Sequence, residues 1–383
     1  MTSTSCEQLA RQVLADCIAG NPPERLPAEL AADECARALF GVLVEGLADR
    51  FDPALCEVYA RLFSAVLPGA DFDRYRRVRE PRPVEREPRR VFVLSRVTLG
   101  ADIAVTSVLM DAAKRRFRAA GIVFAGPHKN FELFAADARL THAPVDYRRG
   151  TLADRLAAAQ DLAALVTGED LVIDPDSRLT QLGLVPVGNE RNYHLFESRS
   201  FGAETDDALP TLAARWAATT FGVPDAKPYL ALRPEAAELP GRYVAISLGV
   251  GENPAKRLPD PFERELLALL AARLPLVIDR GAGGEERARV ERAAEAAGVA
   301  PVWWDGSFAG FAGIVSHARL YVGYDSAGQH AAAAAGVPLI TVFAGFPAPR
   351  MFDRWRPVSP GATVIRCDPP DPAAALAAIR AAL

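Results

Sequence analysis

Short apolar runs alternate with helix-like stretches through most of this sequence, and that alternation limits the possible folds more than any other feature. The first series begins at Arg90, where the chain turns from charged to apolar. Its strand-like runs are Val91-Phe92-Val93-Leu94, Ile122-Val123-Phe124-Ala125 and Leu171-Val172-Ile173-Asp174. Strands that alternate with helices in this way form mostly parallel sheets with helices on both faces. We therefore expect an α/β domain here.

A second series follows a proline- and glycine-rich stretch at 222–242, which we interpret as an inter-domain boundary. Its helix-like stretches lie at 260–272, 284–297 and 327–335, and its strand-like runs at 243–248, 275–279, 319–322 and 338–342. Two consecutive series of about this length predict a pair of Rossmann-like units that face a cleft.

Residues 1–78 have a different character. They contain helix-like stretches at about 5–19, 32–48 and 52–67, and the charged, proline-rich residues 79–88 that follow predict a linker. The expected domains are a helical N-terminal extension with its linker (1–88), an N-terminal Rossmann-like domain (89–235) and a C-terminal one (236–383).

Composition excludes some classes of protein. The 383 residues carry a formal net charge of -4, which argues against general nucleic-acid binding. The sequence shows no apolar run long enough to cross a bilayer and no signal-peptide pattern, so we expect a cytoplasmic protein, with peripheral contact to the inner membrane left open. The five cysteines have irregular spacing, which predicts reduced, buried thiols rather than a zinc site or a disulfide framework.

Three segments follow predicted strands, at the end of a parallel sheet where ligands bind. In the first, residues 95–106, Asp102 lies near the start of a helix; it could accept a proton from an incoming hydroxyl or simply cap that helix. In the second, residues 248–259, a glycine-bearing loop ends in Lys256 and Arg257, which fits a diphosphate site or a solvated surface loop.

The third segment, residues 321–338, places small residues at a strand-to-helix turn. Such a turn lets a phosphate approach the backbone at the positive end of a helix. His330 lies about one turn into that helix, as a ligand contact or as a structural histidine.

Together the three segments resemble the heptosyltransferase family (glycosyltransferase family 9), which transfers heptose from ADP-heptose to lipopolysaccharide core. Arg96 to Thr106 match its first motif, Lys256-Arg257-Leu258-Pro259 its Lys-x-Trp-Pro, and Asp325 to Pro338 its Asp-Ser/Thr-Gly-x-x-His stretch. The order and spacing agree over about 90–383. The chain departs from the pattern at Ala101, Leu258 and Ala327.

The resemblance implies a GT-B fold and an inverting transferase that needs neither a cofactor nor a catalytic metal. Its implied partners are a nucleotide-sugar donor and a glycan, lipid-linked or protein acceptor. Asp102 would be the general base, and Lys256 would neutralise the leaving diphosphate. The expected donor-binding residues are Gly251, Lys256, Glu285, Asp325, Ser326, Ala327, Gly328 and His330, and the expected acceptor-binding residues are Arg96, Thr106 and Arg178.

Some of these residues, and the function itself, admit alternatives. Glu285, a candidate acid for the ribose, also fits an ordinary charged helix start, and Arg178 also fits a surface polar group. A nucleotide-sugar epimerase or hydrolase of the same fold, or a non-catalytic nucleotide-sugar-binding scaffold, would share these motifs. The N-terminal extension is a candidate for recruiting a protein or membrane-associated acceptor.

Overall fold

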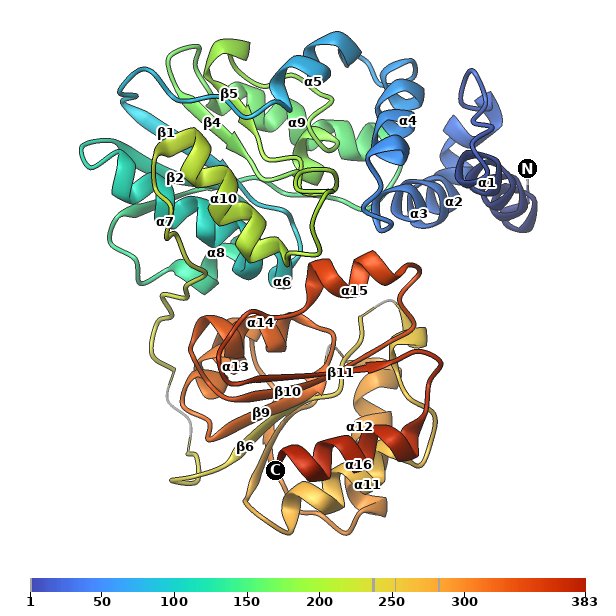
Figure 1. Cartoon of the computed structure of the whole chain (residues 1–383), viewed down its shortest axis with the longest axis vertical. Helices are drawn as coiled ribbons and strands as arrows, with labels where there is room; N and C mark the ends of the chain where they lie inside the picture. The colour runs from blue at the N-terminus through green and yellow to red at the C-terminus, as the bar shows by residue number, and fades with distance from the viewer. Residues whose placement is uncertain (1, 236–237, 252, 282) are drawn as a thin grey trace. The chain divides into compact units, whose positions relative to one another are not determined.

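The computed structural model describes residues 2–235, 238–251, 253–281 and 283–383 (Figure 1). The chain divides into two compact units, each built on its own parallel sheet. Unit 1 contains the residues up to Phe131 together with Ala138–Lys227, and unit 2 contains Glu132–Asp137 together with Pro228–Leu383.

The sheet of unit 1 has five parallel strands in the order β3-β2-β1-β4-β5. In its centre, Phe92 of β1 pairs with Val123 of β2 on one side and with Val172 of β4 on the other. The three strands expected in this half are present, and two edge strands join them. The strands are β1 (Arg90–Leu94), β2 (Gly121–Gly126), β3 (Leu140–Pro144), β4 (Leu171–Asp174) and β5 (Tyr193–Leu195).

Helices connect these strands, as parallel pairing requires. Thr151 and Asp154 cap the start of α9 reciprocally, each side chain bonding the backbone of the other. The helical elements of this part of the chain are α6 (Leu99–Ala101), η4 (Asp102–Thr106), α7 (Ser107–Arg116), α8 (His128–Phe131), η5 (Glu132–Phe134), α9 (Leu152–Leu165), η6 (Arg178–Thr180), η7 (Glu190–Asn192) and α10 (Leu209–Phe221).

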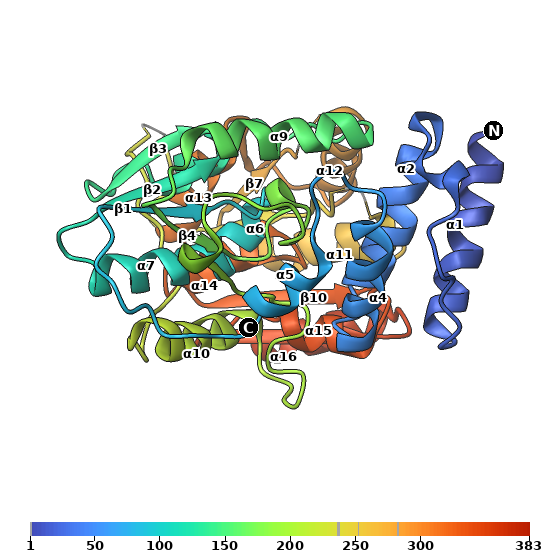
Figure 2. The same cartoon turned by 90° about the horizontal axis from the view of Figure 1, so that it is seen from above.

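The N-terminal segment is helical, as expected, and it contains one further helix, α5. The middle stretch is not one continuous helix but a series of short 3₁₀, α and π turns. Its elements are α1 (Ser3–Ile18), η1 (Ala28–Ala31), η2 (Asp33–Cys35), α2 (Ala36–Ala38), η3 (Leu39–Val44), α3 (Glu45–Ala48), α4 (Pro53–Ser64) and α5 (Phe72–Val78). Figure 2 shows α1, α2 and α4 from above.

These N-terminal helices share one hydrophobic core with the first sheet. Phe40, Tyr59 and Tyr75 belong to the same buried cluster as Val172 and Tyr193 of β4 and β5. The structure therefore joins to the first sheet a segment that the sequence alone sets apart.

The expected linker at 79–88 has no regular helix or strand, yet it is fixed along its length. Arg82 donates to the carbonyl oxygens of Glu190 (2.6 Å) and Tyr193 (2.8 Å). The Val84 N–H donates to the carbonyl of Thr220 at 3.0 Å. Backbone and guanidinium bonds of this kind replace the apolar burial that the segment lacks.

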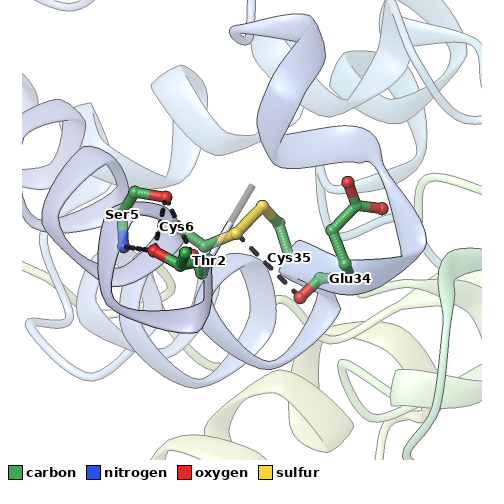
Figure 3. The surroundings of a disulfide bond; sticks show 5 residues. All are labelled: Thr2, Ser5, Cys6, Glu34 and Cys35. Carbon is green, nitrogen blue, oxygen red and sulfur yellow. Dashed lines mark hydrogen bonds between the residues drawn. A yellow bond between two sulfur atoms is a disulfide. The ribbon is translucent and has the colours of Figure 1, made fainter.

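The expectation of five reduced thiols is wrong, because Cys6 of α1 and Cys35 of η2 form a disulfide (Figure 3). The chain folds back between them, which brings their Cα atoms to 5.3 Å although they are 29 residues apart. The spacing of the cysteines in the sequence does not reveal that the chain folds back in this way. Cys17, Cys56 and Cys367 are free and buried, as expected.

Loss of this disulfide should loosen the N-terminal helices. Closing a loop of 29 residues removes conformational freedom from the unfolded chain, so the Cys6→Ala/Cys35→Ala double variant should lose about 2–4 kcal/mol of stability. Urea denaturation would measure the loss. Thiol titration of the denatured, unreduced protein should find three free thiols. A count of five would contradict the bond.

The sheet of unit 2 has six parallel strands in the order β11-β10-β9-β6-β7-β8. Numbered from β6, this is the Rossmann order 3-2-1-4-5-6. The four expected strands and the three expected helices are present. The strands are β6 (Val244–Ser247), β7 (Leu276–Asp279), β8 (Val302–Trp304), β9 (Leu320–Tyr324), β10 (Leu339–Ala344) and β11 (Ala362–Cys367).

Helices on this second sheet complete its core, in which Leu266, Leu270 and Val290 pack against Ile246 and Val322. The helical elements are η8 (Pro254–Lys256), α11 (Phe262–Ala271), α12 (Gly284–Ala296), α13 (Phe308–Ser316), α14 (Ala327–Ala334), α15 (Pro349–Trp355) and α16 (Pro372–Ala382). No helix in the described ranges is both long and apolar enough to span a membrane.

Candidate functional site

Lys256 and Asp325 meet at the carboxyl ends of β6 and β9. These two strands are neighbours in the sheet, with Ser247 paired with Gly323. Lys256 lies in the turn η8 that follows β6, and Asp325 directly follows β9. The Lys256 Nζ is 2.6 Å from Oδ2 of Asp325, and the side chains of Lys256 and Asp325 are 19% and 10% exposed. The structure thus brings together two residues that the sequence predicts as donor contacts.

This pair lies where the strand order reverses. The connection after β6 leads to β7 on one side, whereas β9 lies on the other side. Open parallel sheets bind their ligands in the crevice that this reversal creates. The position of Lys256 and Asp325 is therefore the one at which a Rossmann sheet holds a nucleotide.

The turn after β9 is built from small residues for a local steric reason. A Cβ at Gly328 would lie 2.2 Å from the Tyr321 hydroxyl, so only glycine fits there. Ser326 is the N-cap residue of α14, and Ala327 is its first residue. The first N–H groups of this helix have no partner within the helix and are open to an anion.

Asp325 is held by Gln329, which Thr341 holds in turn, and the sequence singled out neither residue. Gln329 donates from Nε2 to Oδ1 of Asp325 at 2.7 Å, and its Oε1 accepts a bond from the Thr341 hydroxyl at 2.8 Å. This chain fixes the carboxylate that faces Lys256. The spacing Asp-x-x-x-Gln on a helix start would have been a usable signal.

His330 is buried near the pair. Its ring packs against Trp355, with centroids 5.9 Å apart, and lies beside Gln329. Only 5% of the residue is exposed, and burial lowers its pKa to about 4 despite the nearby Asp325 carboxylate. The structure gives His330 a buried, supporting place beside Gln329 and Trp355, and its expected contact with the donor stays a prediction.

His330 should make stability depend on pH. The folded protein keeps the ring neutral down to about pH 4, whereas the unfolded chain binds a proton below about pH 6.5. Stability should therefore fall as the pH drops from 6.5 to 4, by up to about 1.4 kcal/mol per unit. His330→Gln should flatten that slope in urea denaturation at pH 5 and 7. Equal slopes in the two proteins would contradict this.

The carboxylate that approaches the loop after β6 is that of Glu286, not that of Glu285. Glu285 is exposed on the first turn of α12. A Cβ placed on Gly249 would lie 2.9 Å from Oε1 of Glu286, and one on Gly281 would lie 2.1 Å from it. Both glycines leave room for this side chain. Glu286 is thus a second candidate for the ribose acid, and the expected role of Glu285 stays a prediction.

Gly251 is the remaining donor residue that the sequence predicts. It is exposed in the loop between β6 and η8, and its φ of 60° is in the left-handed region, where glycine is favoured. Its role in the structure is to turn this loop toward Lys256.

In unit 1, Asp102 is the centre of a buried network at the carboxyl end of β1. Its Oδ1 accepts bonds from the Arg96 N–H (2.7 Å) and the Thr106 hydroxyl (2.6 Å). Its Oδ2 accepts bonds from the Ser95 hydroxyl and the Asn130 amide, both at 2.6 Å. Asn130 was not predicted from the sequence. Three of the predicted residues, Asp102, Arg96 and Thr106, are thus connected.

Asp102 and Thr106 are fully buried. Burial raises the pKa of Asp102, and its four hydrogen bonds act in the opposite direction. A carboxylate accepts about four such bonds, so protein donors fill its capacity. In this geometry Asp102 anchors the loop that follows β1, and its role as a general base stays a prediction.

The other predicted acceptor residues have protein partners too. Arg96 donates to the Pro175 carbonyl and the Ser198 hydroxyl, each at 2.6 Å, and burial lowers its pKa. Arg178 lies 3.4 Å from Glu45 of α3, in the N-terminal segment. Arg178 is therefore part of the contact between that segment and the first sheet.

The family of the chain follows from its sequence. Residues 188–375 match the family model described as Glycosyltransferase family 9 (heptosyltransferase). This segment, nearly half of the chain, belongs to glycosyltransferase family 9. No curated protein sequence is significantly similar to it.

Solved structures of family 9 glycosyltransferases share the fold. A family 9 enzyme from Veillonella parvula has a TM-score of 0.55 at 14% identity over 75% of this chain and 88% of its own. Heptosyltransferase WaaC of E. coli, solved with ADP, gives 0.54 at 19% over 77% and 100%. ADP-heptose heptosyltransferase II of E. coli gives 0.52 at 16% over 76% and 98%. The expected GT-B architecture of two Rossmann-like domains is confirmed.

In this glycosyltransferase, the described residues contain no group of three or more His, Cys, Asp or Glu side chains placed to hold a metal ion. The charged groups at the carboxyl end of the second sheet include Lys256, Asp325 and Glu286, together with Asp279, the last residue of β7. A lysine beside backbone N–H groups suits a diphosphate, because both interact favourably with its negative charge.

Proposed function

We propose that this chain transfers a sugar from a nucleoside diphosphate sugar to a hydroxyl of an acceptor, with inversion at the anomeric carbon. The observation that carries the proposal is the Lys256–Asp325 pair at the strand-order reversal of a Rossmann sheet. Heptose from ADP-heptose is the leading donor, because residues 188–375 belong to family 9 and the similar WaaC structure contains ADP.

In this proposal, residues 236–383 bind the donor. Lys256 neutralises the diphosphate as it leaves, and the N–H groups at the start of α14 add favourable charge. Asp325 holds the lysine in position before the donor enters. Glu286, next to Gly249 and Gly281, accepts bonds from the ribose hydroxyls.

Residues 89–235 receive the acceptor, and residues 1–88 extend that part of the chain. The acceptor oxygen attacks the anomeric carbon of the donor sugar. The bond between this carbon and the diphosphate oxygen breaks, and the proton of the acceptor hydroxyl passes to a base. Family resemblance assigns that base to Asp102. To act, the carboxylate must exchange one of its four protein donors for the incoming hydroxyl.

The acceptor is a glycan, a lipid-linked glycan such as lipopolysaccharide core, or a protein hydroxyl. The chemistry needs only a nucleophilic hydroxyl, so the acceptor class comes from the family. The shared core of the N-terminal helices and the first sheet makes deletion of residues 1–88 a poor test of recruitment, because the deletion would expose that core.

Calorimetric titration with ADP, UDP, GDP and their sugar conjugates tests the donor. We expect selective binding of ADP and ADP-sugars. A preference for UDP or GDP would keep the fold and change the donor. Binding of none of them would contradict the proposal. In the absence of acceptor, release of ADP from ADP-heptose would favour the hydrolase alternative, and conversion of ADP-heptose to an epimer without release of ADP would favour the epimerase alternative.

A further inference from the structure

Glu263 is a buried acid surrounded by positive charge, close to the loop that bears Lys256. It lies in the first turn of α11 and is 2% exposed. Arg257 donates from Nε to its Oε1 at 3.0 Å, and Arg289 of α12 donates to both of its oxygens. The Tyr324 hydroxyl donates to Oε1 at 3.2 Å. One carboxylate thus joins α11, α12, the end of β9 and the Lys256 loop.

These bonds reach both ends of the loop at 248–258. At its start, Arg289 donates from Nη2 to the Leu248 carbonyl at 2.8 Å. At its end, Arg257 bonds Glu263 directly, and the Leu258 N–H donates to the Tyr324 hydroxyl at 3.3 Å. Both ends of the loop are therefore held by residues that bond the Glu263 carboxylate.

Lys256 lies inside the closed loop, one residue before Arg257. Its partner Asp325 directly follows Tyr324, so the two halves of the Lys256–Asp325 pair adjoin residues that Glu263 holds. A shift of Glu263 would therefore displace neighbours of both Lys256 and Asp325.

A buried ionic cluster is a costly way to stabilise a fold, since apolar side chains of similar volume serve as well or better. Its benefit here is positional, because directed bonds fix a loop that has exposed residues at Gly251, Pro254 and Ala255. Leu258 is buried and its N–H is bonded, so the turn after Lys256 is held by the backbone.

We propose that Glu263 is a positioning residue for the donor diphosphate, acting through Arg257, Arg289 and Tyr324 on Lys256. This proposal rests on the proposed function, in that it concerns the same donor site. Glu263 itself does not contact the donor. With a neutral side chain in place of Glu263, the guanidinium groups of Arg257 and Arg289 lose their shared carboxylate. The two ends of the loop are then no longer held together.

Glu263→Gln tests this, with ADP and adenosine as probes in calorimetry or competition. We expect about a tenfold loss of ADP affinity, the size of one strong charge-assisted bond, and unchanged adenosine affinity. A role confined to stability would weaken both ligands alike or neither. Hydrogen exchange should rise at 248–258. Glu295→Gln, at an exposed position of α12, is the matched control and should change neither readout.

Each outcome decides a different point. Unchanged ADP affinity and unchanged exchange at 248–258 in Glu263→Gln would overturn the proposal, as would equal losses for ADP and adenosine. If the wild-type protein binds no ADP, the proposed function fails, and the exchange measurement still decides whether Glu263 holds the loop.

Should Glu263→Gln fail to fold, Tyr324→Phe removes only the hydroxyl that links Leu258 to Glu263. It should give a smaller loss of ADP affinity with the same selectivity over adenosine. Full retention of ADP affinity in Tyr324→Phe would then count against the proposal.

Discussion

Replacing Lys256 with alanine should lower the rate of sugar transfer by about a hundredfold or more, with the protein still folded. Among the described contacts, Lys256 is the only positively charged side chain bonded to Asp325, with 2.6 Å between Nζ and Oδ2. Without it, the leaving diphosphate develops charge next to the Asp325 carboxylate, which repels it. Steady-state release of ADP from ADP-heptose, with acceptor present, measures the effect.

Arg264→Ala is a matched control for this variant. Arg264 is half-exposed on α11 and lies 3.4 Å from Glu265, on the surface. Its removal should leave transfer unchanged, because an exposed pair of this kind contributes little. A Lys256→Ala protein that transfers at the wild-type rate would remove the central residue of the proposed donor site.

Asp102→Asn should cost about 2–4 kcal/mol of stability, because the amide accepts fewer bonds than the carboxylate it replaces. Its NH₂ group would face one of four donors, and a buried donor would lose its partner. Transfer should fall as well, since the loop after β1 would no longer be anchored. Urea denaturation and the transfer assay, made on the same preparation, measure both effects.

The comparison between the two readouts of Asp102→Asn separates the roles of this residue. Loss of transfer with unchanged stability would show that Asp102 acts chiefly as the base. Loss of stability with retained transfer would remove it from the catalytic machinery. Ser107→Ala provides a control within the same helical region, because the Ser107 hydroxyl donates to the Ile103 carbonyl.

Strands covered on both faces could be predicted from the sequence, and edge strands could not. Val91 to Leu94 form an unbroken apolar run because β1 lies in the centre of its sheet. The edge strand β3 contains Thr141 and His142, and its polar residues gave no signal. Partial exposure at a sheet edge removes the pattern on which such predictions depend.

Part of the proposed donor site was also predictable. Lys256 and Asp325 follow strands that a Rossmann order makes neighbours, so their meeting follows from the topology. The sequence could not tell which of Glu285 and Glu286 approaches the loop after β6, because one residue turns a helix by about 100° and the sequence does not fix the start of α12 so closely. Glu263 was not found, because its partner Arg289 depends on how α11 packs against α12.

The shared core of the N-terminal helices and the first sheet has a consequence for synthesis. The helices that carry Phe40, Tyr59 and Tyr75 leave the ribosome before β4 and β5, which pack against them. At roughly 5–20 residues per second, that interval is several seconds or more. During it, these aromatic side chains have no sheet to cover them, so the nascent chain exposes apolar surface until β4 and β5 are made.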